Sequence, residues 1–383
     1  MINWRLAFVL GASTFSLDRK SLRFPVGRRI LAVCLLLPFF LVLTFSNRFF
    51  MLLDWVFFPF FSKEKIDKPV FIVGVARSAT TFLYKTMAKD HEQFTCFRFW
   101  ELLFAPSIIQ KYICVGIIAL DRKIGRPVKR LALQMDKIFL KRINRVHETG
   151  LNKVEEDEIL LLYTFSSMYL NFFYPEVKAL DQVLFFDEQF PEKRKKRVMN
   201  YYRRCVQRHM YVFGNSSQKT FLSKNPAFIS KLGSIADLFP DAKLIYMIRS
   251  PYKTIPSVIN MNALVSSLFC NTKYLSSGNV RTSEVVMRWY EIADASIRAH
   301  WTNRHLIVPF KEVTSNPKET LNAIYSFLAI SSTPLAFAIR NEEQGLVKQN
   351  STTASYDQKA GVDSDRISSR LKFILEGPYK DLI

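Results

Sequence analysis

Short apolar runs alternate with helical patterns along most of this chain, and that alternation constrains its fold more than any other feature. Residues 69–74 (PVFIVG) and 243–248 (KLIYMI) have the length of strands and lack the apolar–polar alternation of a half-exposed sheet. Strands of this kind are buried on both faces, as in parallel sheets. A helix is predicted after each strand, over residues 81–89 and from Pro251 onward. We therefore expect an α/β fold with a parallel sheet flanked by helices.

Further elements extend this pattern over a single large domain, which we predict to comprise residues 68–383. Residues 221–223 and 306–310 are predicted strands, and helices are expected up to Leu238 and over residues 317–328. The region from about residue 100 to 215 is predicted to be a helical cap inserted between the first two of these strands. Within it, residues 158–174 are apolar nearly all round, which predicts one buried helix that packs in the core or lines a substrate pocket.

The first 67 residues form a basic and apolar segment that we predict to associate with a membrane. Residues 30–46 are uncharged but barely long enough to cross a bilayer, and a second apolar stretch, residues 49–61, follows Arg48. Cations flank both sides, which favours a re-entrant or monotopic hairpin with Arg48 near its tip and the domain on the cytoplasmic face. The alternatives are a single-span anchor with a lumenal domain and a buried core helix.

Charge and cysteine content narrow the class of partner and the compartment. The net charge of +21 favours anionic partners such as nucleotides, sulfated or phosphorylated substrates, or an acidic membrane surface. The five cysteines are odd in number and form no CxxC pair, so neither a disulfide framework nor a zinc site is indicated, which favours a reducing compartment. Glycosylation sequons at Asn215 and Asn350 weakly favour the opposite.

The loop after the first strand has the features of an anion site. Residues 74–81 (GVARSATT) join a buried strand to a helix, where backbone N–H groups favour an anion. The hydroxyls of Ser78, Thr80 and Thr81 add donors. The loop of nucleotide triphosphatases has a lysine before its final Ser or Thr, but here that place holds Thr80 and the cation is Arg77. The pattern suits a nucleotide without a triphosphate, although an ordinary strand-to-helix turn remains open.

A second anion site is predicted at the end of the strand 243–248. Arg249 follows this strand directly, at the sheet edge where open α/β folds bind ligands. Ser257 lies within the first two turns of the helix that begins at Pro251. An arginine fork and a hydroxyl placed in this way are able to bind one phosphate together.

Together the two segments resemble the sulfotransferase superfamily, in the branch whose first loop reads roughly GxPRSGTT and whose later motif reads FPDAKxIxxxRxP. Here the motifs are GVARSATT and, at residues 239–251, FPDAKLIYMIRSP. The resemblance covers about residues 68–330 and implies a P-loop-like fold with 3′-phosphoadenosine 5′-phosphosulfate as cosubstrate. It implies that Arg249 and Ser257 hold the 3′-phosphate. It assigns the 5′-phosphosulfate to the first loop, namely to Arg77, Ser78, Ala79, Thr80 and Thr81.

Two positions depart from the branch pattern. Ala76 stands where proline is preferred, and Ala79 stands where glycine is preferred. If position 79 requires a positive φ, alanine strains the loop by about 1 kcal/mol. If the glycine serves only for close approach to phosphate, the cost is smaller. In either case, weakened donor binding and loss of activity both remain open.

Four residues are candidates for the chemistry. Arg77 is placed to stabilise charge on the leaving group, and the resemblance implies that Lys224 lies near the transferred group or the acceptor. The resemblance also favours Glu101 as general base, with a pKa raised by its apolar neighbours, although a helix-start glutamate would serve the helix dipole equally. His147 is an alternative base or acceptor ligand. No metal is demanded, because the leaving group lacks the charge of a triphosphate.

These features predict a membrane-associated sulfotransferase acting on a hydroxyl or amine of an unidentified acceptor, possible classes being a lipid or a glycan. A kinase on the same fold is one alternative, but it predicts the missing loop lysine. A catalytically weakened, membrane-bound nucleotide-binding protein is another, and the two alanines are its best support. A nucleic-acid binder would explain the charge but not the motifs at the strand ends, so no nucleic-acid partner is expected.

Overall fold

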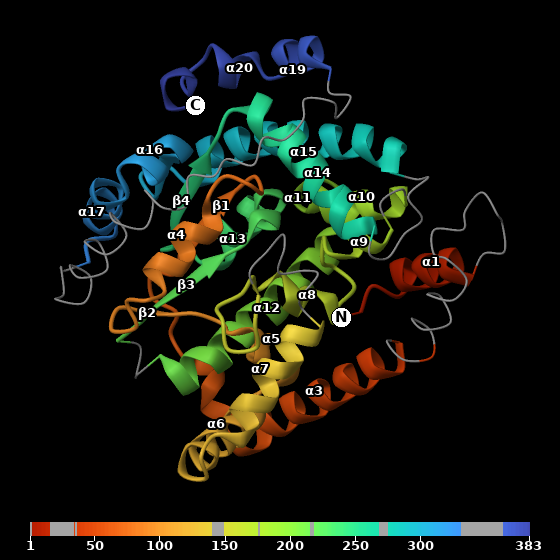
Figure 1. Ribbon diagram of the computed structural model, residues 1–383, viewed down its shortest axis with the longest axis vertical. Coiled ribbons are helices and arrows are strands. Elements are labelled where there is room, and N and C mark those ends of the chain that lie inside the picture. Colours follow the sequence, from red (N-terminus) through yellow and green to blue (C-terminus); the bar gives the residue numbers. More distant parts are fainter. Residues whose placement is uncertain are drawn as a thin grey trace.

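A five-stranded parallel sheet forms the centre of the molecule (Figure 1). The structure is a computed structural model that describes residues 2–15, 34, 37–139, 149–174, 177–214, 218–267, 275–330 and 363–383. The strand order is β2-β3-β1-β4-β5, and neighbouring strands are parallel throughout. The strands are β1 (Val70–Gly74), β2 (Phe94–Thr95), β3 (Thr220–Lys224), β4 (Lys243–Ile248) and β5 (His305–Pro309). The predicted fold class is confirmed, and only the two-residue β2 was missed.

Strand β1 shows why the sheet needs cover on both faces. All five of its residues are buried. Phe71 and Val73 belong to one apolar core, whereas Val70 and Ile72 belong to a second core on the opposite face. The last residue of the strand, Gly74, has to be a glycine, because a β-carbon there would lie 2.5 Å from the carbonyl oxygen of Met247 in β4. The close approach of β1 and β4 brings the segments after these two strands together.

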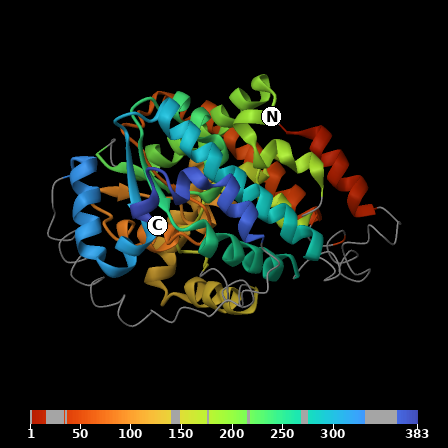
Figure 2. The same cartoon turned by 90° about the horizontal axis from the view of Figure 1, so that it is seen from above.

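Helices cover the two faces of the sheet (Figures 1 and 2). Helices α4 (Thr80–Met87) and α17 (Pro317–Leu328) supply side chains to the smaller core. Helices α13 (Leu232–Leu238), α14 (Pro251–Ser267) and α15 (Leu275–His300) pack on the other face. The remaining short elements on this body are the 3-10 helix η5 (Pro226–Lys231), α16 (Phe310–Ser315), α19 (Ser364–Arg370), α20 (Lys372–Leu375) and η7 (Lys380–Leu382). Arg370 fixes α19 to α15 through Glu284 and Glu291.

The chain between β2 and β3 is helical, as predicted. Its elements are α5 (Phe99–Phe104), α6 (Ile108–Lys123), α7 (Pro127–Phe139), α8 (Glu158–Leu162), α9 (Leu170–Phe173), η4 (Lys178–Leu180), α10 (Asp181–Leu184), α11 (Phe186–Gln189) and α12 (Glu192–Phe213). The prediction of a single helix over 158–174 is wrong. A turn separates α8 from α9, and Phe165 within it has a φ of 53°, which no α-helix accommodates.

The N-terminal segment differs from the predicted hairpin. Its described helices are α1 (Trp4–Phe15), α3 (Leu37–Phe57) and the short η2 (Pro59–Lys63). Helix α3 runs unbroken through Arg48, whose Nη2 donates to the carbonyl of Tyr163 at 3.0 Å, so Arg48 does not lie at the tip of a hairpin. By length and composition α3 is able to span a membrane. Only 11% of its most apolar 18-residue stretch is buried in the protein. The alternative of a buried core helix is therefore wrong.

Candidate active site

The loop between β1 and α4 has the geometry of an anion cradle. It contains two non-glycine residues with left-handed backbone, Arg77 at φ 74° and Ala79 at φ 64°. Ala79 immediately precedes α4, and no side chain caps the helix start. The backbone N–H groups of the first turn are therefore left for a ligand. The positive φ at Ala79 is the strained case considered from the sequence.

Ser78 gives a direct indication of a missing partner in this loop. Its side chain is fully buried, and its Oγ has no hydrogen-bond partner among the described residues. A buried hydroxyl without a partner costs free energy, so such atoms usually belong to a ligand or water site. Thr80, two residues further, is also buried. The loop thus fits a bound phosphate or sulfate group.

The second predicted anion site lies directly beside the first. Arg249 follows β4, and its Nη1 donates to the carbonyl oxygen of Arg77 at 2.7 Å. The Nε of Arg77 in turn donates to the Oγ of Ser257 at 3.2 Å. The guanidinium of Arg249 stacks on Phe310, 4.2 Å from the ring centre, which fixes its plane. The structure therefore brings Arg77, Arg249 and Ser257 together at one edge of the sheet.

Lys224 ends β3 at the same edge and forms a buried pair that the sequence did not predict. It lies opposite Ile72 of β1, and its Nζ is ion-paired with Oε1 of Glu156. The other carboxylate oxygen of Glu156 accepts a hydrogen bond of 2.6 Å from the Tyr169 hydroxyl. The hydroxyl of Tyr84, one turn into α4, donates to the backbone of Glu155 at 3.5 Å. The segment with Glu156 thus lies over the helix that begins at the anion cradle.

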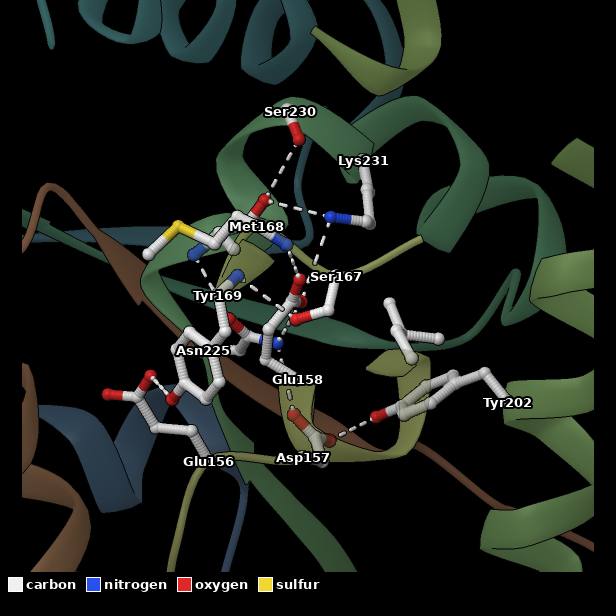
Figure 3. A network of polar contacts seen from close by, with 12 residues as sticks. Glu156, Asp157, Glu158, Ser167, Met168, Tyr169, Tyr202, Asn225, Ser230 and Lys231 are labelled. Carbon is white, nitrogen blue, oxygen red and sulfur yellow. Dashed lines mark hydrogen bonds and ion pairs between the residues drawn. The ribbon is translucent and has the colours of Figure 1, made fainter. Parts of the chain in front are cut away.

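Two neighbouring acids hold this segment in place (Figure 3). Asp157 accepts hydrogen bonds from Tyr202, from Ser223 at 2.8 Å and from Asn225 at 3.3 Å. Burial, reinforced by the nearby charge of Glu158, raises the pKa of Asp157 to about 7 despite these donors.

Glu158 accepts from the backbone N–H of Met168 at 2.6 Å and from Asn225 at 3.0 Å. The signal that sequence analysis missed is the run of four acids at residues 155–158 in an otherwise basic chain. So many buried carboxylates in one place require a set of donors around them.

Glu101 lies in a separate buried cluster. Its Oε1 accepts from the backbone N–H of Arg98 at 3.1 Å, which caps the start of α5, and its Oε2 lies 2.8 Å from Nδ1 of His209 and 3.6 Å from Nζ of Lys111. Burial alone would raise the pKa of Glu101, but His209 and Lys111 outweigh it and hold the pKa below its usual value. The expectation of a raised pKa is therefore wrong.

The remaining sequence candidates are placed as follows. His147, Asn215 and Asn350 lie outside the described residues.

A largely apolar crevice opens beside the first loop. It lies between α9, α14 and α15. Ala76 of the loop forms part of its wall, together with Phe172, Met261 and Trp289. Its position next to the anion cradle makes it a candidate site for an apolar part of a substrate.

A parallel sheet with two segments suited to anions at the ends of neighbouring strands defines an open-sheet α/β protein, a class whose ligand sites lie at this edge. Within that class, residues 69–334 match the model of the sulfotransferase family, and the chain belongs to this family.

Two solved structures share the fold. STF9 from Mycobacterium avium has a TM-score of 0.73 at 16% sequence identity. The match covers 97% of this chain and 89% of the STF9 chain. STF1 from Mycobacterium tuberculosis has a TM-score of 0.68 at 16% sequence identity. The match covers 96% of this chain and 91% of the STF1 chain.

A curated relative gives a further similarity. The omega-hydroxy-beta-dihydromenaquinone-9 sulfotransferase Stf3 of Mycobacterium bovis is 25% identical over 200 residues. The same named protein of Mycobacterium tuberculosis matches equally. The match covers 51% of this chain and 45% of the relative, so the chain spans about half the length of the curated relatives it matches.

Proposed function

We propose that this sulfotransferase uses 3′-phosphoadenosine 5′-phosphosulfate as its donor. The observation that carries the proposal is the direct contact between the two anion sites, through Arg249, Arg77 and Ser257. One nucleotide with a phosphate at its 3′ position and a phosphosulfate at its 5′ position is able to bridge sites that touch in this way. The partnerless Ser78 hydroxyl supports the assignment of the 5′ group to the first loop.

Each loop residue then has a defined part in transfer. The backbone N–H groups of the α4 start, together with Ser78, Thr80, Thr81 and the strained backbone at Ala79, orient the phosphosulfate. Arg77 stabilises the negative charge that develops on the 5′-phosphate as its bond to sulfur breaks. Arg249 and Ser257 hold the 3′-phosphate. The acceptor oxygen forms the new bond to sulfur, and its proton passes to a general base.

For the general base we propose Glu156, with Glu101 and His147 as the alternatives from sequence. Glu156 is paired with Lys224 at the sheet edge, next to the helix that begins at the anion cradle. Glu101 has all its described partners in the cluster of α5, α6 and α12. Lys224 then holds the Glu156 carboxylate in position and neutralises charge around the transferred group.

For the acceptor we propose the hydroxyl of a membrane lipid in preference to a glycan. The curated relatives are named for a menaquinone-type lipid. The apolar crevice beside the cradle suits an apolar chain, and the exposed apolar helix α3 favours a position of the protein at a membrane. On the positive-flank argument this is the cytoplasmic face.

Nucleotide titration tests the donor. Adenosine 3′,5′-bisphosphate should bind in the absence of magnesium and more tightly than magnesium-ATP. Preference for magnesium-ATP would instead identify a kinase, and binding of the bisphosphate without any sulfate transfer would identify a weakened nucleotide-binding protein.

Turnover of paired variants tests the base. With radiolabelled donor and a total lipid extract, Glu156→Gln should lower kcat by about 10²- to 10⁴-fold and leave donor affinity unchanged. Glu101→Gln should chiefly lower thermal stability, because it weakens a buried ion cluster. A variant Glu101→Gln with normal stability and lost turnover would return the role of base to Glu101.

A further inference from the structure

Helix α3 has two faces of opposite character. Asn47, Met51 and Asp54 are its buried residues, and their spacing of four and three places them in one stripe on the side of the catalytic body. On the opposite side, Phe45, Phe49, Leu52 and Val56 are between 48% and 75% exposed. Their spacing of four, three and four forms a second stripe. The helix therefore presents a polar side to the protein and an apolar side to its surroundings.

The buried stripe fastens α3 firmly to the body. Asp54 and Arg208 of α12 form a fully buried ion pair of 2.7 Å, and Asp54 also accepts from the backbone N–H of Ile108 at the start of α6. Two turns earlier in α3, Asn47 accepts from the side chain of Gln110 at 2.9 Å. A buried charge cannot leave its partner without a large cost, so α3 stays alongside the domain.

Helices α6 and α7 continue the exposed apolar surface. Packing of α3 on α6 and of α6 on α7 gathers all three helices at the lower end of the molecule in Figure 1. Exposed side chains recur along α6 at intervals of four, three and four residues, and along α7 at intervals of three and four. These exposed residues are Ile113, Ile117 and Leu120 of α6, Ile124 directly after α6, and Val128, Leu131 and Met135 of α7.

Exposed cations border the same three helices. Lys63 and Lys65 follow α3, and further exposed cations lie at the end of α6 and along α7: Arg122, Lys123, Arg126, Lys129, Arg130 and Lys137. The two acids on α6 and α7 face backbone groups instead. Asp121 accepts from the N–H of Val128 at 2.7 Å, and Asp136 accepts from the N–H of Leu151 at 3.3 Å. The border of the apolar surface is therefore strongly positive.

We propose that α3, α6 and α7 form one docking face for an anionic phospholipid bilayer, with α3 lying in the plane of the membrane surface. The apolar stripes enter the acyl boundary, and the bordering cations contact anionic headgroups. A helix that spanned the bilayer would carry the Asp54–Arg208 pair, and with it the basic helix α12, to membrane depth. The in-plane orientation leaves those charges on the protein side.

The docking face is also joined to the segment that bears Glu156. Arg48 of α3 donates to the carbonyl of Tyr163, which directly follows α8, and the Tyr163 hydroxyl donates to the carbonyl of Leu103 at 2.7 Å. Asn47 donates to the same carbonyl at 3.1 Å. The candidate active site is thereby held at a fixed orientation to the membrane surface. Docking itself does not depend on the proposed donor or acceptor.

Vesicle cosedimentation of the full chain tests the surface and the role of charge. The wild type should bind vesicles of phosphatidylcholine and phosphatidylserine and bind pure phosphatidylcholine at least tenfold more weakly. The double change Lys129→Glu and Arg130→Glu should reduce binding to the anionic vesicles by at least tenfold. The control change Lys372→Glu, at an exposed cation on α20, should leave it unchanged. Equal binding to both vesicle types, or equal losses for both variants, would overturn the charged border.

The apolar stripe is tested separately with Leu52→Ser and Ile117→Ser against Val280→Ser, an exposed apolar residue on α15. Only the first two changes should weaken vesicle binding, and nucleotide binding should remain as in the wild type. Unaltered vesicle binding in Leu52→Ser with Ile117→Ser would show that these helices serve another purpose, such as docking of a second protein.

Depth measurements decide between an in-plane and a spanning helix. An environment-sensitive fluorescent amino acid is placed in turn at Leu41, Phe45, Leu52 and Val56, and its quenching by lipids brominated at defined depths is recorded. The in-plane orientation predicts the same shallow depth at all four positions. A spanning helix predicts depths that differ by about 22 Å between the ends, from a rise of ~1.5 Å per residue. A graded series of depths, or no quenching in vesicles that bind the protein, would overturn the proposal.

Discussion

The sheet edge and the docking face of this molecule are built in opposite ways. At the sheet edge, polar groups converge and contact one another directly, as Arg249, Arg77 and Ser257 do. On the docking face, α3, α6 and α7 turn apolar side chains outward, with exposed cations at their border, and keep the ion pair of Asp54 and Arg208 inside. A site for a small anion therefore depends on a few fixed donors, whereas a site for a membrane depends on the sidedness of whole helices.

This difference determines how each region responds to mutation. A single side chain contributes a large share of the sheet-edge site, so one truncation should remove a defined part of ligand affinity. On the docking face the outward residues act through their summed area, so a single truncation should have a small effect. The buried charge of α3, Asp54, is an exception, because its removal alone should have a large effect.

The largest effect is expected from Asp54→Ala. Removing one partner of a buried ion pair typically costs about 3–5 kcal/mol, and here the hydrogen bonds from the backbone N–H groups of Ile108 and Ile109 at the start of α6 are lost as well. Leu52→Ala, two residues away on the outward side, should change the free energy of unfolding by less than ~0.5 kcal/mol. Chemical unfolding in detergent micelles measures both. Similar losses for the two variants would contradict the opposite roles of the two faces of α3.

Arg249→Ala should weaken donor binding next most strongly. Loss of a charge-assisted hydrogen bond costs about 1.5–3 kcal/mol, or about 10- to 150-fold in affinity. Because the change also removes the contact to the Arg77 carbonyl, two nucleotides are compared by calorimetry. Affinity for adenosine 3′,5′-bisphosphate should fall, and affinity for adenosine 5′-phosphosulfate, which lacks the 3′-phosphate, should fall much less. Equal losses would mean that Arg249 acts only by holding the loop.

Asp157 should make stability depend on pH. Burial raises its pKa to about 7, from the usual value of about 4 for an aspartate, so the folded state binds a proton more strongly than the unfolded chain. This contribution to stability is complete at low pH and is lost as the pH rises through the interval from about 4 to 7, by at most ~1.4 kcal/mol per pH unit.

The variant Asp157→Asn lacks this titration. Its melting temperature should fall less between pH 5 and pH 7.5 than that of the wild type, as measured by calorimetric scans in matched buffers. Parallel curves for the two proteins would show that Asp157 does not titrate in this range.

The smallest effect is expected from Ala79→Gly. Left-handed backbone strains alanine by about 1 kcal/mol, so glycine should raise stability by a similar amount and bind the donor slightly better. Ala329 has a φ of 55° at the end of α17, away from the two anion sites, and serves as a matched control. Ala329→Gly should raise stability without a change in donor affinity. A gain in donor affinity in both variants would show that the gain does not come from relief of strain in the loop at Ala79.

The predicted strands show which parts of the fold are accessible from sequence. The boundaries of β4 and α17 agree with prediction, because an uninterrupted apolar run and a proline at a helix start are local signals. The two-residue β2 was missed because it is too short to carry a pattern. Residues 158–174 were predicted as one helix because their composition is uniformly apolar, and only the backbone at Phe165 reveals the break.

The candidate site follows the same division. The loop 74–81 and Arg249 were found from sequence because each directly follows a buried strand, and adjacent parallel strands deliver such residues to one edge. The contact of Glu156 with Lys224, on which its proposed role rests, was not predicted, because the two residues are 68 positions apart and the acid run does not indicate which side chain faces the site. The prediction of a raised pKa for Glu101 was wrong for the same reason, because its partner His209 is distant in the chain.

The sequence by itself determined the parallel α/β architecture, the position of two candidate anion-binding segments and the family, because these depend on patterns within a few consecutive residues. Only the tertiary structure decided which charges are paired, which acid lies at the sheet edge and which side of α3 faces outward. Asp54 and Arg208 are 154 residues apart, and their contact gives the helix its sidedness. Such contacts arise when distant elements pack, and the energy of a buried charge depends entirely on the partner that packing supplies.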